Sequence, residues 1–152
     1  MRSTDFDLID RVFGLLDDRE SSNGPDSISD IERVVLLVWH ASGIIGNGGF
    51  RYFFECGLPL RPTAEAYSRI GVEQAATILF GLLDLFPRQR VPDDWDERME
   101  FVDRLCEQHR DLFDRWERDY YATDDLMERQ LAGWIRVHDD LFHATTVLKH
   151  DT

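Results

Sequence analysis

Residues 47–86 read NGGFRYFFECGLPLRPTAEAYSRIGVEQAATILFGLLDLF, and this stretch decides the fold. Its second half, from Val72 to Phe86, has apolar residues at i, i+3, i+4 and i+7 on nearly every side, which is typical of a buried helix. The adjacent glycines Gly48 and Gly49 indicate a place where the backbone needs a positive φ or approaches another segment closely. We therefore expect the second half to be the centre of the core, with these side chains in the interior: Ile78, Leu79, Leu82 and Phe86.

The rest of the chain also follows helical periods, and no alternating strand pattern exceeds a few residues. Turn and proline signals separate the helices at 19–26, 46–49 and 87–92. The expected fold class is all-α, a single-domain irregular bundle of about six or seven helices over residues 1–152. The expected helices are 4–17 capped by Thr4, 29–43 opened by a Ser29–Glu32 capping box, 50–56, one capped by Thr63, the apolar helix of 72–86, 93–118, and a last one from Thr123 or Asp124 toward Leu148.

Composition limits the classes of function. The chain has 17 Lys and Arg against 30 Asp and Glu, a net charge of -13, which argues against direct nucleic-acid binding. It lacks an apolar run of membrane length and a signal-peptide pattern. Two cysteines do not make a disulfide framework, so we expect a cytoplasmic protein with reduced thiols.

The negative charge is concentrated in one part of the chain. Residues 93–128 hold 14 acidic and 5 basic residues, whereas residues 33–92 hold 4 acidic and 6 basic ones. A compositional explanation competes with a functional one, because 20 of the 30 acids are Asp and Lys149 is the only lysine. A GC-rich or salt-adapted genome would produce that bias without any function.

The expected helix of residues 93–118 places its acids on one side. At 100° per residue, seven carboxylates fall within one stripe about 80° wide and roughly 32 Å long. Apolar residues such as Val102, Leu105 and Trp116 fall on the opposite side, and arginines flank the stripe. Regular anions along a rod resemble the phosphates of a DNA strand, although a solvated outer helix face would look the same. The proposed partner-binding residues are Asp93, Asp96, Glu100, Asp103, Glu107, Asp111 and Asp114.

Other residues of suitable chemistry do not converge on a site. One group has residue types that commonly bind metal ions but lacks the spacing of a metal site: His138, Asp139, Asp140 and His143. We therefore expect no metal or cofactor. Cys106 and His109 lack an orienting group for a catalytic dyad. Asn47 has the character of a turn residue that tolerates left-handed φ.

Several motifs resemble a known family. The chain is similar to a bacterial domain-of-unknown-function family that includes the DNA-mimic protein nineteen. The motifs that carry this resemblance are Asn47-Gly48-Gly49-Phe50, Phe53-Phe54, Ala66-Tyr67, Ile70-Gly71, Ala75-Ala76 and Leu85-Phe86-Pro87. The resemblance covers about residues 39–137 and is weaker after Asp119. It implies an all-α fold, and for the named member a dimer whose acidic surface imitates DNA phosphates on a helix-turn-helix transcription factor. The matched motif belongs to the core, so it supports the fold directly and the mimicry by analogy.

Three functions follow as hypotheses. The first is a non-enzymatic acidic module that covers the DNA-binding face of a basic protein. This module could form a homodimer. The second is an immunity-like inhibitor of a basic nuclease toxin, which uses the same electrostatics but has one cognate partner. The third is an enzyme or small-molecule binder with a pocket near the Asn47-Gly48-Gly49 turn.

Overall fold

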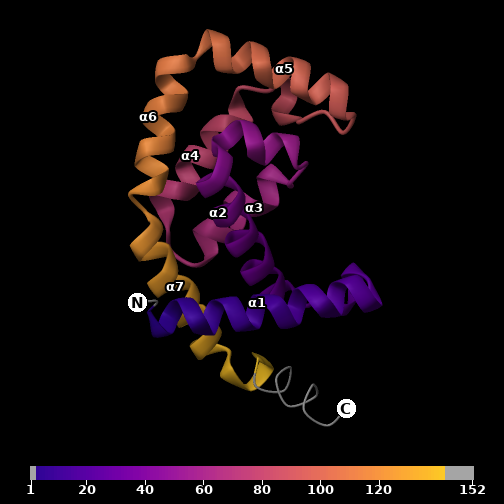
Figure 1. Cartoon of the computed structure of the whole chain (residues 1–152), viewed down its shortest axis with the longest axis vertical. Coiled ribbons are helices and arrows are strands. Elements are labelled where there is room, and N and C mark those ends of the chain that lie inside the picture. Colours follow the sequence, from indigo (N-terminus) through magenta and orange to yellow (C-terminus); the bar gives the residue numbers. More distant parts are fainter. Residues whose placement is uncertain (1–2, 143–152) are drawn as a thin grey trace.

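The computed structural model describes residues 3–142, and the regular elements of this part of the chain are all helices, without a strand (Figure 1). The expected all-α class is confirmed. The α-helices are α1 (Thr4–Asn23), α2 (Asp30–Glu55), α3 (Leu60–Arg69), α4 (Glu73–Asp84), α5 (Trp95–Gln108), α6 (Arg110–Tyr121) and α7 (Asp124–Val137). Two of the connections contain a 3₁₀ turn: η1 (Pro25–Ser27) lies between α1 and α2, and η2 (Pro87–Gln89) lies between α4 and α5. None of these helices has the length and apolar character needed to cross a bilayer.

The core forms around α4, as the apolar pattern of residues 72–86 predicts. Ile78, Leu79, Leu82 and Phe86 are all buried. Helix α3 packs beside α4, and α6 crosses it where the Trp116 ring lies over Gly81. A Cβ at Gly81 would lie 2.8 Å from that ring, so the glycine permits the close crossing.

Helix α2 is longer than the sequence suggests. Its start is the predicted capping box, in which Ser29 and Glu32 exchange side-chain-to-backbone hydrogen bonds. The predicted end near Gly43 and the separate helix 50–56 are wrong, because the helix continues to Glu55 with a kink at Gly49. Buried Ala41 and Ile45 continue the apolar face past Gly43, which favours continuation over a turn.

Two other helix boundaries also differ from expectation. Helix α1 is capped by Ser3, whose hydroxyl accepts the Phe6 N–H (3.0 Å), and not by Thr4 as expected. The helix extends to Asn23 rather than Asp17, because Glu20 pairs with Arg33 and Gly24, at φ 87°, ends the helix. Helix α3 starts at Leu60 rather than after Thr63. Thr63 is buried inside that helix, where its hydroxyl donates to the Pro59 carbonyl (2.6 Å).

The expected single helix over residues 93–118 is also wrong. His109, at φ -124° and ψ 35°, breaks it into α5 and α6. Figure 1 shows α6 leaving α5 at a steep angle. The bend has a packing reason: α5 lies against α2, whereas α6 lies against α4 and α2. One straight helix would not follow both surfaces, and tertiary packing overrides the continuous helical pattern.

Helix α7 ends at Val137 and packs against α1 and α2. The expected continuation toward Leu148 is interrupted at His138, at φ -105° and ψ 33°, and residues 139–142 are helical again. The rest of the expected continuation, from His143 on, lies outside the described residues.

Candidate functional site

Helix α5 carries the ordered part of the acidic stripe. Asp96, Glu100, Asp103 and Glu107 are exposed and spaced by four, three and four residues, so they lie along one face over about 16 Å. The side chain of Asp94 caps the helix by accepting the Glu97 N–H (2.9 Å). The opposite face is buried through Met99, Val102 and Leu105, so packing fixes which way the carboxylates point.

The remaining predicted site residues do not continue that row. Asp93 precedes α5, and Asp111 and Asp114 lie on α6 beyond the bend at His109. All three are exposed, but the expectation of one straight row of roughly 32 Å is wrong. Six of the carboxylates instead lie on the two arms of a corner formed by α5 and α6, and Asp93 lies outside this corner, before the start of α5.

A hollow inside this corner brings three of the predicted residues together. It has a volume of about 580 Å³. Asp103, Glu107 and Asp114 line it from α5 and α6. The whole lining, which we call the corner hollow, is Arg51, Asp103, Cys106, Glu107, Arg110, Phe113, Asp114 and Glu117.

Arg51 enters the corner hollow from the second half of α2. Its Nε lies 2.9 Å from Asp103 Oδ1, and its Nη1 lies 3.2 Å from Glu55 Oε2. The hydrogen bond to Asp103 raises the pKa of the Arg51 guanidinium. Asp103 is thus already paired within the chain. Sequence spacing on α5 gave no signal for this pair, since its two members are 52 residues apart.

Glu117 is a second residue of the corner hollow that sequence reasoning missed. Its Oε1 accepts the backbone N–H of Phe50 (2.9 Å), the first N–H after the kink. An added Cβ at Gly49 would collide with the same carboxylate oxygen. The adjacent glycines did signal a close approach, but not which side chain approaches.

The structure also bears on the small-molecule hypothesis near Asn47-Gly48-Gly49. Gly49 is buried beneath Glu117, and Phe50 fills the core below it. Asn47 and Gly48 are exposed on the outside of α2. The kink therefore places the Glu117 side chain directly against Gly49.

Activated cysteine and metal chemistry have little support in the corner. Burial, followed by the nearby Asp103 carboxylate, raises the pKa of the Cys106 thiol, whereas a nucleophilic cysteine needs a lowered pKa. Within residues 3–142, no three His, Cys, Asp or Glu side chains are grouped to hold a metal ion.

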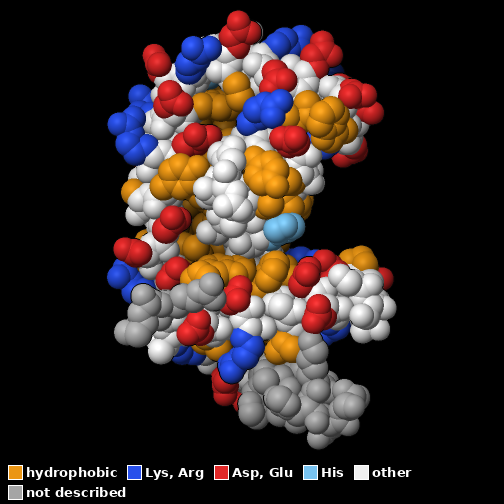
Figure 2. Space-filling view, in the orientation of Figure 1, with side chains coloured by type: hydrophobic (Ala, Val, Ile, Leu, Met, Phe, Trp, Pro, Cys, Tyr) orange, Lys and Arg blue, Asp and Glu red, His pale blue; other side chains and the backbone are white. Residues whose placement is uncertain are grey.

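The outer surface around the corner mixes both signs of charge. Figure 2 shows Asp and Glu side chains over the end of the molecule formed by α5 and α6, with Lys and Arg side chains between them. The flanking arginines Arg104, Arg110, Arg115 and Arg118 are exposed. The acids still dominate, with 11 acidic and 5 basic residues between positions 93 and 121.

A comparison with protein families gives one relevant match. The sequence model described as DMP19-like protein matches residues 26–138, which contain α2 to α7 and all seven predicted carboxylates. Searches of curated proteins and of solved structures return no significant match.

Proposed function

Because the chain belongs to the DMP19-like family, we propose that it is a non-enzymatic acidic module that binds a basic DNA-binding protein and competes with DNA for that protein's surface. The supporting observation is the state of the exposed carboxylates on α5 and α6. Of the seven, only Asp103 has a basic nitrogen within 4.0 Å in residues 3–142. The other six carry charge that a partner's Lys and Arg side chains can neutralise.

The spacing on α5 fits this role. Four carboxylates over about 16 Å place one charge every 5 Å or so, compared with one phosphate charge every 3.4 Å along a DNA strand. The stripe is sparser than DNA but of the same sign and regularity. Exposed charges of this kind act mainly on the association rate, and salt screens them over about 8–10 Å.

A competition experiment tests the proposal. The protein is used to capture partners from its native host, with elution by a salt gradient and identification by mass spectrometry. The captured partner is then bound to fluorescent DNA, and the DNA is displaced with wild type or with the triple variant Asp96→Asn, Glu100→Gln and Glu107→Gln. We expect the variant to displace the DNA only at a concentration at least about tenfold higher than the wild type needs, because three charges of the stripe are lost.

The control removes the same charge elsewhere. The triple variant Asp17→Asn, Asp26→Asn and Glu65→Gln changes exposed acids outside the corner and has the same net charge as the test variant. It should displace DNA as well as the wild type does. Equal weakening of both variants would mean that total charge matters rather than this surface, and a partner that never binds DNA would refute the proposal. A partner that cleaves nucleic acid would instead favour an inhibitor of a basic nuclease.

A further inference from the structure

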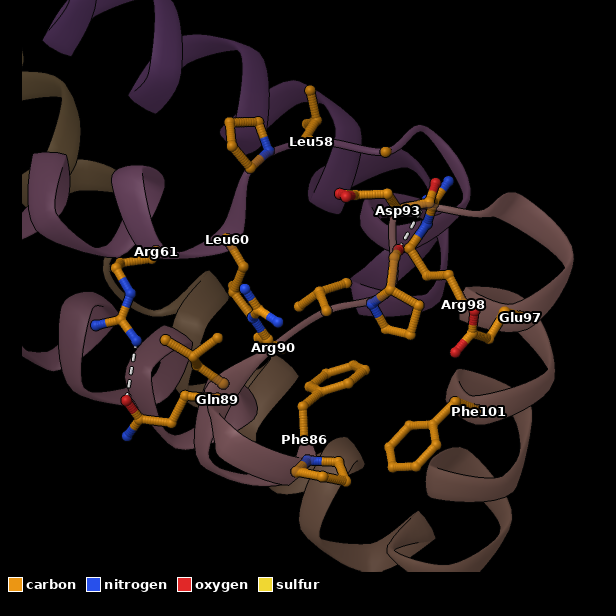
Figure 3. Close-up of a pocket in the computed structure, with 16 residues that line it drawn as sticks. Leu58, Leu60, Arg61, Phe86, Gln89, Arg90, Asp93, Glu97, Arg98 and Phe101 are labelled. Atoms are coloured by element: carbon orange, nitrogen blue, oxygen red, sulfur yellow. Dashed lines mark hydrogen bonds between the residues drawn. The ribbon is translucent and has the colours of Figure 1, made fainter.

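A second hollow of the molecule has a different chemistry from the acidic corner. It lies where the turn between α2 and α3, the η2 connector and the start of α5 meet (Figure 3). Its volume is about 820 Å³, within the size range of small-molecule sites. We call it the arginine groove, because Arg61, Arg90 and Arg98 line it together with an apolar wall that includes Leu60, Phe86 and Phe101.

The central feature of the groove is the buried guanidinium of Arg98, whose residue is only 8% exposed. Its Nε donates to the Phe54 carbonyl (2.7 Å), and its Nη1 donates to the carbonyls of Pro92 (3.2 Å) and Asp93 (2.9 Å). A guanidinium has five N–H donors. Three are therefore used, and the two on Nη2 have no acceptor among residues 3–142.

The free end of Arg98 opens toward the groove. No fully buried side-chain nitrogen or oxygen among the described residues lacks a hydrogen-bond partner, so the unpartnered Nη2 must still reach solvent. An added Cβ at Gly57, which also lines the groove, would lie 3.3 Å from Nη2. Nη2 therefore lies at the Gly57 side of the groove, with two donors available to a ligand.

The charge of Arg98 is also unpaired. Its three acceptors are neutral carbonyls, and no carboxylate of the described residues lies within 4.0 Å of its nitrogens. Asp93 and Glu97 line the same groove, and Figure 3 shows the Asp93 carboxylate directed away from the guanidinium. Buried charges are normally paired, which makes an unpaired one in an acidic protein a point of attraction for an anion.

A purely structural role explains only part of this geometry. Phe54 is next to the last residue of α2, and a cation at a helix C-terminus is favourable. That role accounts for the Nε donor, and the two Nη1 donors fasten the connector before α5. It leaves the two donors of Nη2 unexplained.

The other groups of the groove suit an anion with an apolar body. Arg61 is held by the neutral side chain of Gln89 (2.9 Å), and Figure 3 shows its guanidinium pointing to that amide. Arg90 is exposed, and its side chain has no hydrogen-bond or ion-pair partner among residues 3–142. Phe86 and Phe101 stack on each other with ring centroids 5.1 Å apart and form an apolar wall of the groove.

We propose that the arginine groove binds a small organic carboxylate that has an aromatic or aliphatic body. The carboxylate accepts hydrogen bonds from Arg98 Nη2 and lies within the field of Arg90, while the body packs on the wall formed by Phe86 and Phe101. Charge-assisted hydrogen bonds of this kind are the stronger ones. The site is separate from the acidic corner, and its occupation does not depend on the function proposed for that corner.

The first test compares two probes that differ only in charge. 4-Phenylbutyrate and its primary amide are titrated into the whole protein, with isothermal titration calorimetry for the Kd and ¹H–¹⁵N spectra for the location. We expect the carboxylate to bind at least about tenfold more tightly than the amide. The largest shifts should fall on the Arg98 Nε–H and on the amides of Gly57 and Phe101. Equal Kd values, shifts centred elsewhere, or no binding up to about 10 mM would overturn the proposal.

The second test uses charge-reversal variants that do not threaten the fold. Arg90→Glu places an exposed carboxylate on the groove lining, and Arg129→Glu makes the same change on α7. We expect Arg90→Glu to raise the Kd for 4-phenylbutyrate at least about fivefold and to lower the ratio of the amide Kd to the carboxylate Kd. Arg129→Glu should leave both Kd values unchanged. Arg98→Gln, if its circular dichroism is that of the wild type, should bring this ratio close to one. A ratio that both Arg90→Glu and Arg98→Gln leave unchanged would refute the assignment.

Discussion

The carboxylate of Glu117 on α6 caps the backbone N–H of Phe50 on α2, at a distance of 2.9 Å and across 67 residues of sequence. The cap is needed because the kink at Gly49 gives the second half of α2 an N-terminus of its own, where N–H groups lack helical acceptors. A negative charge at a helix N-terminus also interacts favourably with the helix dipole. One side chain thus joins the glycine motif to the acidic corner.

Removing this cap should destabilise the protein measurably. We expect Glu117→Ala to lower the free energy of unfolding by about 1–2 kcal/mol, the usual effect of losing a helix cap. Urea unfolding followed by circular dichroism measures it. Asp114→Ala, an exposed residue one turn earlier on α6, is the control and should change stability by less than about 0.5 kcal/mol. Equal losses for the two variants would show that the hydrogen bond to Phe50 contributes nothing.

The two glycines of the motif should resist substitution for different reasons. Gly49 has φ 72° and ψ -169°, a region almost restricted to glycine, so Gly49→Ala should cost about 1–3 kcal/mol. Gly48 has no positive φ, but a Cβ there would lie 2.5 Å from the Tyr52 Cβ, and Gly48→Ala should also destabilise. Gly46, a helical position with nothing within 4 Å of an added Cβ, is the matched control. Gly46→Ala should stabilise by about 0.4–1 kcal/mol in the same urea titration.

The core helix α4 should be sensitive to side-chain truncation. Leu82 is 1% exposed, so Leu82→Ala should cost about 2–5 kcal/mol. Leu126→Ala, at a residue that is 37% exposed, should cost less than about 1 kcal/mol. A loss below about 0.5 kcal/mol for Leu82→Ala would contradict the placement of α4 at the centre of the core.

Stability should fall in alkaline solution because of two buried phenols. Tyr67 and Tyr120 are hydrogen-bonded to each other in the core, and burial raises the pKa of both above the ordinary value. The folded state therefore favours the neutral phenols, whereas the unfolded chain ionises near pH 10. The contribution of these phenols to the free energy of unfolding is complete below that pH and is lost as the pH rises toward their pKa in the folded state. The loss is up to about 1.4 kcal/mol per pH unit for each phenol.

Urea titrations between about pH 8 and pH 11 measure this slope. The double variant Tyr67→Phe and Tyr120→Phe removes both groups and retains Tyr52 and Tyr121. Its free energy of unfolding should fall less steeply with pH than that of the wild type. Parallel slopes would contradict the assignment to this pair.

Local sequence signals predicted the helices whose start and apolar face are encoded within a few residues. The Ser29–Glu32 capping box and the continuous apolar pattern around Leu82 are of this kind, and both are confirmed. The break at His109 was not predictable, because no glycine or proline marks it and the bend follows from packing on two different helices. The adjacent glycines indicate a special backbone position at Gly49, but they do not show that the kink lies inside one helix rather than between two.

The same division holds for the candidate site. The exposure of the α5 acids follows from the helical period, which places Glu100 opposite Val102 and Leu105. The roles of Arg51 and Glu117 depend on contacts between distant segments, and residue spacing within one helix carries no information about them. Whether this surface binds a partner stays a prediction.

The bend at His109 also determines the curvature of any surface that can touch both arms of the corner. Carboxylates of the two arms come together in the corner hollow, where Asp103 and Glu107 of α5 lie with Asp114 of α6. A partner that contacts both arms at once would therefore reach into this hollow. The α5 stripe of about 16 Å is close to half of one 34 Å helical turn of DNA, so under the proposed function α5 would set the length of a partner's footprint and the corner hollow would set its shape.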